Sequence, residues 1–413
     1  MPRRTRVLTM IMAGGKGERL HPLTRERSKP AVPFGGRHRI VDFVLSNFVN
    51  SDLLSLYILV QYKSQSLIEH VRLAWRTSGI LPDAFVTIVP PQMRTGPGWY
   101  RGTADAVLQN LNLVDDFAPD VIAVFGSDHI YRMDVNQMLA FHLESGAGVT
   151  VAARPVPLVE ASQFGVLAVD RQGRVTHFDE KPESPAALPG EPGRALVSMG
   201  NYLFNRAVLT DALLADARRS TEHDFGRTII PELVPGVPVY AYDFQQNEVP
   251  GVKAYEEPGY WRDVGTIEAY WHAHMDLLGE APRFDLDNRD WPILTGQQPG
   301  PPARFIGSEV DDAHVSEGAL IKRATIRHSI LGRNVWVNEG AVIEDSIIMD
   351  HTTVGKGARL RRAIVDRFNI IPADTEIGFD AAADRRRWHA DPSGLVVVPR
   401  GGRREFLRGL DDL

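Results

Sequence analysis

The chain has 413 residues, 43% of them hydrophobic, which is enough to bury a large core and too many for one typical domain. Its 46 basic and 52 acidic residues give a formal net charge of -6, so the overall charge would not gather nucleic acid or an anionic membrane surface. The absence of cysteine excludes disulfides, thiol catalysis and cysteine-based zinc sites.

No apolar run approaches the roughly 20 residues that a membrane span needs. The start of the chain, Met-Pro-Arg-Arg-Thr-Arg, has no apolar stretch of the kind found in signal peptides. We therefore expect a cytoplasmic protein with no nucleic-acid or membrane partner. The 13 histidines never take the His-Glu-x-x-His spacing of a zinc helix, which leaves open a hard cation held by oxygen ligands.

Short β-rich runs alternate with helical patterns over the first two thirds of the chain. The predicted strands are 7–12, 56–60, 85–89, 121–125 and 149–153, each bounded by polar residues, glycine or proline. This alternation is typical of a layered α/β domain with a mainly parallel sheet.

Two helices are predicted from apolar spacing. Behind Thr103, the expected N-cap, apolar residues stand at helical intervals: Ala104, Val107, Leu108, Leu111 and Val114. The second helix follows Thr266 and is expected to end at Gly279, with an apolar stripe of Ile267, Tyr270, Trp271 and Leu278.

A proline-rich segment separates this region from a different pattern; its prolines are Pro282, Pro292, Pro299, Pro301 and Pro302. We interpret the segment as a connector between domains. The predicted organisation is a first domain over 1–281, the connector over 282–303, a second domain over 304–399 and a tail over 400–413.

Beyond the connector, apolar residues recur six apart in four pairs: Val315/Ile321, Val337/Ile343, Val354/Leu360 and Ile371/Ile377. Three residues after the first member of each pair stand Gly318, Gly340, Gly357 and Asp374, and the last three pairs begin 17 residues apart. This spacing predicts a parallel β-helix whose triangular coils take about 18 residues each. The alternative, an antiparallel sandwich, would not place glycine repeatedly at one phase.

A glycine-rich turn, Gly14-Gly15-Lys16-Gly17, follows the first predicted strand. Glycines let backbone N–H groups approach anionic oxygens, and Lys16 and Arg19 would neutralise the charge of a triphosphate. The turn is neither a Walker loop, which needs Gly-Lys-Ser/Thr, nor a dinucleotide fingerprint, because Leu20 occupies the third glycine position. A tight turn with solvated charges is the alternative.

Two carboxylates are candidates for a metal site. Asp128 follows the predicted strand 121–125, and Asp263 lies in the segment Trp-Arg-Asp-Val-Gly-Thr that ends at Thr266. Ligands of open α/β sheets gather at the carboxyl ends of strands, where an Asp can bind a cation that bridges phosphates. A helix N-cap or an Asx turn is the alternative for either residue. Lys29, just before Pro30, is either a phosphate partner or a solvated surface lysine.

Two further segments have the composition of ligand sites. Trp99 and Tyr100, which lie between glycines, could stack on a base or cover a domain edge. Glu180 and Lys181 suit sugar hydroxyls and a sugar phosphate respectively, or form a surface ion pair.

Seven segments together resemble bacterial glucose-1-phosphate adenylyltransferases, the ADP-glucose pyrophosphorylases of glycogen synthesis, and the resemblance covers almost the whole chain. The segments are 13–20, 29–30, 99–106, 127–131, 178–182, 198–200 and 261–266. The resemblance implies a Rossmann-like nucleotidyltransferase domain with a mainly parallel sheet, followed by a left-handed parallel β-helix domain, in a homotetramer.

The implied reaction converts ATP and α-D-glucose 1-phosphate to ADP-glucose and diphosphate, the first step of glycogen or α-glucan synthesis, with Mg²⁺ as cofactor. The sugar phosphate attacks the α-phosphorus in line, so catalysis rests on positioning and charge neutralisation. By resemblance the catalytic residues are Arg19, Lys29, Asp128 and Asp263, of which the two Asp hold Mg²⁺. The implied nucleotide contacts are Gly14, Gly15, Lys16, Gly17, Tyr100 and Gly102, and the implied glucose 1-phosphate contacts are Tyr100, Gly165, Glu180, Lys181 and Ser198.

Three features depart from the family pattern. Ser127 stands where related enzymes often have glycine, and Arg37 stands where some have an activator-binding lysine, although a guanidinium binds phosphate with different geometry. The tail begins basic and ends Asp-Asp-Leu. We expect allosteric control by an anionic metabolite that binds between the domains, with Arg37, Arg39 and Arg386 as candidate contacts.

Four alternatives stay open at this point. The first is the same reaction with another base or sugar, as in GDP-mannose or UDP-glucose enzymes, although segments 99–106 and 261–266 favour the adenylyl branch. The second is a regulatory subunit without catalysis, against which the joint presence of Arg19, Lys29, Asp128 and Asp263 argues. The others are a nucleotide-sensing module and a second, acyltransferase activity of the β-helix, where His314, His328 and His351 are better explained as turn residues.

Overall fold

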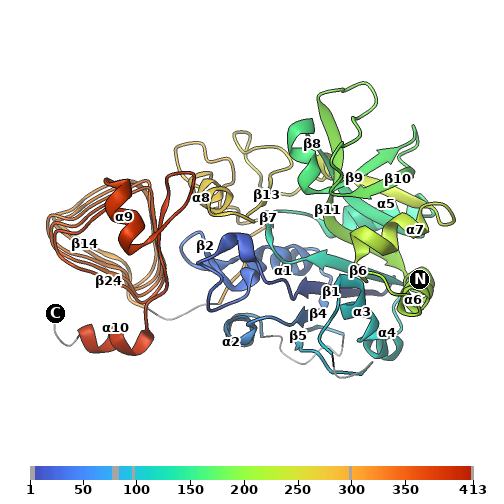
Figure 1. Ribbon diagram of the computed structural model, residues 1–413, viewed down its shortest axis with the longest axis horizontal. Coiled ribbons are helices and arrows are strands. Elements are labelled where there is room, and N and C mark those ends of the chain that lie inside the picture. Colours follow the sequence, from blue (N-terminus) through green and yellow to red (C-terminus); the bar gives the residue numbers. More distant parts are fainter. Residues whose placement is uncertain (1–4, 77–82, 95–97, 297–299, 411–413) are drawn as a thin grey trace.

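The computed structural model describes residues 5–76, 83–94, 98–296 and 300–410 (Figure 1). Pro299 of the predicted connector and residues 411–413 of the predicted tail lie outside these ranges. An α/β domain and a triangular β-helix lie side by side, with α8 (Ile267–Met275) and the short β2 (Pro33–Phe34) between them (Figure 1). Among the described residues no helix has the length and apolar character needed to cross a membrane.

The α/β domain is built on one mixed sheet. Its parallel part consists of β6 (Val121–Gly126), β1 (Val7–Ala13), β4 (Ser55–Val60) and β5 (Phe85–Val89), in that spatial order. β11 (Arg194–Asn205) runs antiparallel beside β6 and continues the sheet to β9 (Gly165–Val169), β10 (Val175–Glu180) and β8 (Val149–Pro157), with β12 (Val239–Asp243) parallel to β8. All five strands predicted from the sequence are present, within a few residues of their expected ends.

Helices and buried side chains cover both faces of this sheet. The helices are α1 (Ile40–Asn50), α2 (Gln65–Ala74), α3 (Thr103–Leu108), α4 (Leu111–Phe117), α5 (Val135–Glu144), α6 (Arg206–Ala217) and α7 (Ile230–Leu233). In β1, Val7 and Ile11 face one core cluster and Leu8 and Met10 face the other, because successive side chains of a strand point to opposite faces. This double burial explains the nearly continuous apolar run at the start of the domain.

The two predicted helices need correction at their ends. The prediction of one helix behind an N-cap at Thr103 is wrong, because Gly102 is the N-cap and the segment divides into α3 and α4. The hydroxyl of Thr103 instead donates a hydrogen bond to Asp224. Thr266 does cap α8, since its hydroxyl accepts from the N–H of Ala269 at 3.1 Å, but the helix ends at Met275 and not near Gly279.

The second domain is a left-handed β-helix of parallel ladders. One face consists of β14 (Arg304–Ile306), β16 (Leu320–Lys322), β18 (Trp336–Val337), β21 (Thr353–Val354) and β24 (Ile370–Ile371). The other two faces consist of β15 (Glu309–Val315), β17 (Thr325–Leu331), β19 (Val342–Glu344), β20 (Ile347–Ile348), β22 (Arg359–Arg361), β23 (Ala363–Val365) and β25 (Glu376–Ile377), followed by β26 (His389–Ala390) and β27 (Val396–Val398). Val337 pairs with Val354 and Val354 with Ile371, so the predicted β-helix is confirmed, with coils of 17 residues here against the predicted value of about 18.

The corners of the triangle explain the spaced glycines. Each corner is a stack of residues with positive φ; one stack is Arg323, Gly340, Gly357 and Asp374, the next is Gly318, Asn334, His351 and Phe368, and the third is Asp312, His328, Asp345 and Arg362. Glycine adopts this left-handed conformation without steric cost. His328 and His351 take the positive φ of corner residues, as the sequence suggested, although His328 also falls within β17; His314 lies within β15 and is not at a corner.

The first apolar pair, Val315/Ile321, does not share the phase of the other three. Val315 pairs with Leu331, and it is Ile321 that pairs with Val337. Gly318 accordingly lies at a different corner from Gly340. The prediction of one common phase for all four pairs is wrong, because Glu309–Val315 forms a long strand that continues past a corner.

The two domains share a buried boundary. The guanidinium of Arg27 lies 2.6 Å from Oδ2 of Asp366 in the β-helix, and both side chains are 1% exposed. The indole N–H of Trp271 donates to the carbonyl of Asp345 at 2.9 Å. Beyond the coils follow α9 (Ala381–Arg387) and α10 (Arg403–Leu410), of which α10 lies below the β-helix in Figure 1.

Candidate active site

A cavity of about 810 Å³ opens at the carboxyl ends of β1, β4 and β6. Every residue that the sequence analysis assigned to catalysis or to substrate binding lines it, from the turn 14–17 to Asp263. The parallel strands bring the turn 14–17 and Asp128 together, because their carboxyl ends meet at one edge of the sheet, and the antiparallel strands and the β7–β13 ribbon add the other residues.

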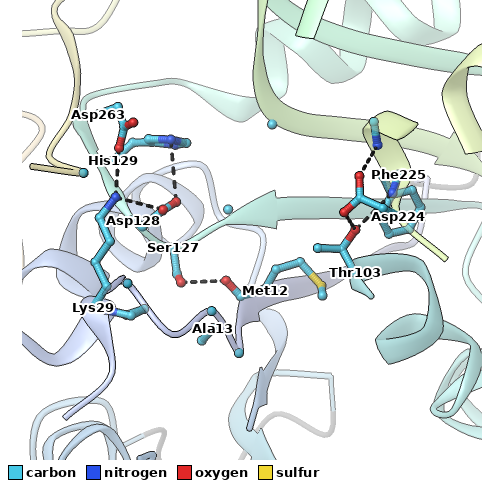
Figure 2. A pocket seen from close by; sticks show the side chains of 18 of the residues that line it. Met12, Ala13, Lys29, Thr103, Ser127, Asp128, His129, Asp224, Phe225 and Asp263 are labelled. Carbon is cyan, nitrogen blue, oxygen red and sulfur yellow. Dashed lines mark hydrogen bonds and ion pairs between the residues drawn. The ribbon is translucent and has the colours of Figure 1, made fainter. Parts of the chain in front are cut away.

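Lys29 lies at the centre of a charged group in the cavity. Its Nζ is 2.9 Å from Oδ2 of Asp128 and 2.8 Å from Oδ1 of Asp263, and only 8% of the lysine side chain is exposed (Figure 2). Figure 2 shows Lys29, Asp128, His129 and Asp263 together on one side of the cavity. The alternative readings of these residues as a solvated lysine and two turn-capping carboxylates therefore do not describe their positions.

A two-stranded ribbon brings the two carboxylates together across 135 positions of sequence. β7 (His129–Tyr131) pairs antiparallel with β13 (Trp261–Asp263), and Asp263 lies opposite His129 in the register. Asp128 directly precedes β7, and Ser127 anchors the turn before it by donating to the carbonyl of Met12 at 2.6 Å. Ser127 is thus accommodated with its hydroxyl satisfied.

In this group, burial and ion pairing shift the pKa values in opposite directions. Burial by itself would raise the pKa of Asp128, but the nearby Lys29 and His129 lower it, and the net result is a pKa well below the ordinary value for Asp. Burial by itself would lower the pKa of Lys29, but Asp128 and Asp263 raise it above its ordinary value. Asp128 and Lys29 therefore stabilise each other in their charged forms.

The same residues could hold a metal ion. Asp128, His129 and Asp263 each place one possible ligand atom within 4.8 Å of the others, and they are the one such group of three among the residues that the structure describes. Carboxylate oxygens are preferred ligands of hard divalent cations.

The glycine-rich turn borders this group. Gly17 has φ +63° and begins the short 3-10 turn η1 (Glu18–Leu20), so the backbone needs glycine there. Lys16 is 67% exposed and lies 3.7 Å from Glu18, whereas Arg19 is 61% exposed and lies 3.7 Å from Asp263. Both basic side chains are thus free to turn toward an anionic ligand.

Tyr100 closes the cavity on the side of β4. Its hydroxyl accepts a hydrogen bond from the amide of Asn110 at 3.0 Å, and its backbone N–H and C=O both bond to the side chain of Gln61. Gln61 was missed in the sequence, although its place directly after a predicted strand could have marked it. Trp99 remains 59% exposed.

The opposite side is formed by the antiparallel strands. Gly165 leaves no room for a side chain, because a Cβ there would lie 2.5 Å from the ring of Phe178 and 2.8 Å from Glu180. Burial raises the pKa of Glu180, and Lys181, at 3.7 Å, lowers it less than burial raises it. The hydroxyl of Ser198 accepts from the N–H of Gly200 at 3.1 Å.

Comparison with known proteins identifies the family of this site. A family model described as nucleotidyl transferase matches residues 8–280, and one described as GlmU-like, C-terminal hexapeptide matches residues 301–398. A glucose-1-phosphate adenylyltransferase of Thermodesulfovibrio yellowstonii is 52% identical over 399 residues, which are 96% of this chain and 97% of the relative. The chain belongs to the glucose-1-phosphate adenylyltransferase family. Relatives of the same name from Anaeromyxobacter sp. and, as number 1, from Vibrio vulnificus are each 49% identical, over 97% and 96% of this chain and 99% and 98% of their own lengths.

In this adenylyltransferase chain, the three arginines expected to bind an effector lie apart. Arg37 lies at the domain boundary, 3.3 Å from Glu317 of the β-helix. Arg39 is partly buried near Arg367 and Arg27, and desolvation of its guanidinium, followed by these two charges, lowers its pKa to about 9. Arg386 has a different neighbourhood, since it is an exposed residue in the last turn of α9.

Arg27, Arg39 and Arg367 form a basic cluster at the domain boundary, and the sequence analysis singled out only Arg39. Arg27 and Arg367 lie in different domains, so only the fold brings them to Arg39. Within the described residues, Nε and Nη1 of Arg27 and Nε of Arg367 are buried without a hydrogen-bond partner. Buried donors of this kind normally find an acceptor.

Proposed function

We propose that this protein converts ATP and α-D-glucose 1-phosphate to ADP-glucose and diphosphate. The observation that carries the proposal is the Lys29 ammonium held between Asp128 and Asp263 in a cavity bordered by a glycine-rich turn. The near full-length similarity to proteins named glucose-1-phosphate adenylyltransferase supports the choice of substrates.

In this reaction an oxygen of the sugar phosphate forms a bond to the α-phosphorus, and the bond from that phosphorus to the diphosphate breaks. No covalent enzyme intermediate is needed. The chain contributes charge and position: N–H groups of the turn 14–17 bind phosphate oxygens, while Arg19 and Lys29 neutralise the charge that the reacting phosphates carry.

Mg²⁺ fits the carboxylate group. Asp128 and Asp263 offer oxygen ligands within one site, which is the donor chemistry that Mg²⁺ prefers. When bound, the ion would neutralise phosphate charge and polarise the reacting phosphorus. The chain itself orients these ligands through the β7–β13 ribbon and through Ser127.

On the other side of the cavity, Glu180, Lys181, Ser198 and Gly165 would bind glucose 1-phosphate. The carboxylate of Glu180 can accept from sugar hydroxyls, and Lys181 is 51% exposed, so that its ammonium can reach a phosphate. Tyr100 and Gly102 line the same cavity at the nucleotide side and complete the proposed contacts.

We also propose regulation by an anionic metabolite at the basic cluster between the domains. Arg27, Arg39 and Arg367 face the carboxylates of Asp350 and Asp366, which leaves an excess of positive charge. Buried guanidinium N–H groups without partners favour an anion. Arg37 lies at the same boundary, whereas Arg386 stays a prediction from the sequence alone.

The open end of the β-helix offers a surface for association with another copy of the chain, as the predicted homotetramer requires. Phe305 and Val310 occupy inward-facing positions of the first coil and are still 50% and 38% exposed, because the described part of the chain forms no further coil over them. A strand edge of this kind is a template for pairing with another chain. The tetramer, the domain limits 1–281, 282–303, 304–399 and 400–413, and the cytoplasmic location stay predictions.

One assay tests the function. Purified protein is incubated with Mg²⁺, glucose 1-phosphate and ATP, GTP, UTP or dTTP in turn, and the released diphosphate is measured. Release with ATP alone is expected; release with another nucleotide would favour a different member of the fold, and no release with any nucleotide from folded protein would favour a regulatory subunit. Addition of fructose 1,6-bisphosphate, fructose 6-phosphate or pyruvate tests the regulation, and Arg39→Gln is expected to abolish any stimulation.

A further inference from the structure

A buried pair of side chains lies behind the cavity and outside every site assigned above. Nδ1 of His223 is 2.6 Å from Oδ2 of Asp216, at the end of α6, and each side chain is 3% exposed. Thr221 completes the pair, since its hydroxyl donates to Oδ1 of Asp216 at 2.6 Å and accepts from the backbone N–H of His223 at 3.1 Å. Removal of either partner of this buried hydrogen bond would leave the other partner's polar atom unpaired, which is costly.

The pair fixes an unfavourable backbone conformation. His223 has φ +50°, a left-handed conformation that an L-residue with a side chain adopts only at a steric cost. With this conformation the carbonyl of His223 accepts hydrogen bonds from two N–H groups at the start of α3, those of Ala104 at 2.8 Å and Asp105 at 3.3 Å. The turn around His223 thereby satisfies donors that a helix start leaves unpaired.

The contact between this turn and α3 is tight. A Cβ on Gly102 would lie 2.3 Å from the carbonyl oxygens of Glu222 and His223, so only glycine permits the approach. The next residue, Asp224, accepts from the hydroxyl of Thr103 at 2.9 Å (Figure 2). Thr103 in turn accepts from the N–H of Phe225 at 3.0 Å.

The turn connects the two halves of the cavity. Gly102 and Thr103 line it beside Tyr100, whereas Phe225 and Gly226 line it beside Glu180. A Cβ on Gly226 would lie 2.5 Å from Oε2 of Glu180, so the turn approaches this carboxylate closely enough that only glycine fits between them. Figure 2 shows Thr103, Asp224 and Phe225 across the cavity from Lys29 and the two carboxylates.

We propose that Asp216 and His223 are positioning residues, which hold the turn 222–226 against the start of α3. They thereby keep Glu180 at a fixed position relative to the nucleotide side of the cavity. Neither residue touches a substrate. This inference rests on the proposed function, because the consequence of losing the pair is weaker binding of glucose 1-phosphate.

Steady-state kinetics of Asp216 variants test the role of the pair. We expect Asp216→Ala to raise the KM for glucose 1-phosphate at least tenfold while kcat and the KM for ATP change less than threefold. Asp216→Asn, which keeps an acceptor for the His223 N–H, should recover most of the loss. Asp211→Ala, which removes an exposed carboxylate from the same helix, should behave as the unmodified protein.

A second variant separates the side chain from the backbone. His223→Gly accepts the positive φ but lacks the hydrogen bond to Asp216, so we expect the same tenfold rise in the KM for glucose 1-phosphate. An unchanged KM in both His223→Gly and Asp216→Ala would overturn the proposal.

Amide exchange followed by mass spectrometry gives a readout that needs no turnover. Peptides covering 100–108 and 220–228 should exchange faster in Asp216→Ala and His223→Gly than in Asp211→Ala, and equal rates would contradict the inference. Failure of the unmodified protein to release diphosphate would instead refute the proposed function, and the exchange rates would still decide the role of the pair.

Discussion

Gly17 lies so close to Lys29 that a Cβ on the glycine would be 2.9 Å from Cβ of the lysine. The same Cβ would be 3.2 Å from a methyl carbon of Thr24, whose hydroxyl donates to the carbonyl of Gly17. The phosphate-binding turn and the ammonium that bridges Asp128 and Asp263 are therefore packed as one unit. A change at the turn must move the lysine.

Gly17→Ala should lower both stability and activity, whereas Gly15→Ala should leave stability unchanged. The first replacement meets Lys29 and needs φ +63°, which costs about 1–2 kcal/mol for alanine, and the second finds no atom within 4 Å of its Cβ. Urea unfolding of the two variants makes the comparison. Equal unfolding midpoints would show that the turn tolerates a side chain at both positions.

Asp128→Asn should lower kcat by about 100-fold or more, because a bridging metal supplies several kcal/mol and each 1.4 kcal/mol is about tenfold in rate. Diphosphate release under saturating substrates measures the effect. Asp179→Asn is the matched control, since Asp179 is an exposed carboxylate paired with His177 and lies outside the cavity. A loss below tenfold in Asp128→Asn would remove this residue from the catalytic group.

Lys181→Gln should raise the KM for glucose 1-phosphate about tenfold and change the KM for ATP little, because a charge-assisted contact to phosphate is lost only on the sugar side. Steady-state kinetics with each substrate varied in turn give the two KM values separately. Lys322→Gln, at an exposed position of β16, serves as the control for loss of a positive charge. A defect confined to ATP would contradict the assignment.

The stability of the protein should fall as the pH drops below 6.5, and His274 should account for part of the fall. Burial lowers the pKa of His274 to about 3, and Nε2 accepts from the N–H of Gly35 at 3.2 Å, which requires the neutral ring. Below pH 6.5 the unfolded chain binds a proton that the folded state does not, so stability is lost between pH 6.5 and pH 3, by about 2 kcal/mol at pH 5. His38, with a pKa lowered to about 4 by burial, acts in the same direction.

Unfolding free energies of His274→Gln at pH 7.5 and pH 5 check this. The unfolding free energy at pH 7.5 minus that at pH 5 should be about 2 kcal/mol smaller in His274→Gln than in the unmodified protein. His272→Gln, an exposed histidine two positions earlier on α8, should keep the full pH dependence. An unchanged difference in His274→Gln would mean that another group carries the acid sensitivity.

The repeating and locally determined parts of the fold could be predicted from the sequence. The strand 121–125 and the coils beginning at Val337, Val354 and Ile371 are set by side-chain alternation and by turn residues close in sequence. The antiparallel half of the sheet was less clear. Its strand β10 carries the exposed polar residues Thr176, His177 and Asp179, so it lacks the continuous apolar run that marks the strands of the parallel part.

The geometry of the active site depends on long-range pairing, which no local pattern reveals. Asp128 and Asp263 were singled out separately, but only the β7–β13 register places them around Lys29. Thr103 was predicted to be an N-cap because no nearby residue in the sequence offered its hydroxyl another hydrogen-bond partner. Its actual partner, Asp224, lies 121 residues further along the chain. Arg27 and Arg367 were missed for the same reason.

The stacked left-handed corners make the β-helix a structure whose length can change only in whole coils. Removal of the 17 residues 337–353 would return the chain to the same point of the triangle, about 4.8 Å lower. Removal of one residue would instead turn the following inward side chains toward solvent. Since Asp345 and Asp366, on successive coils, both contact the first domain, the number of coils also sets where that domain attaches.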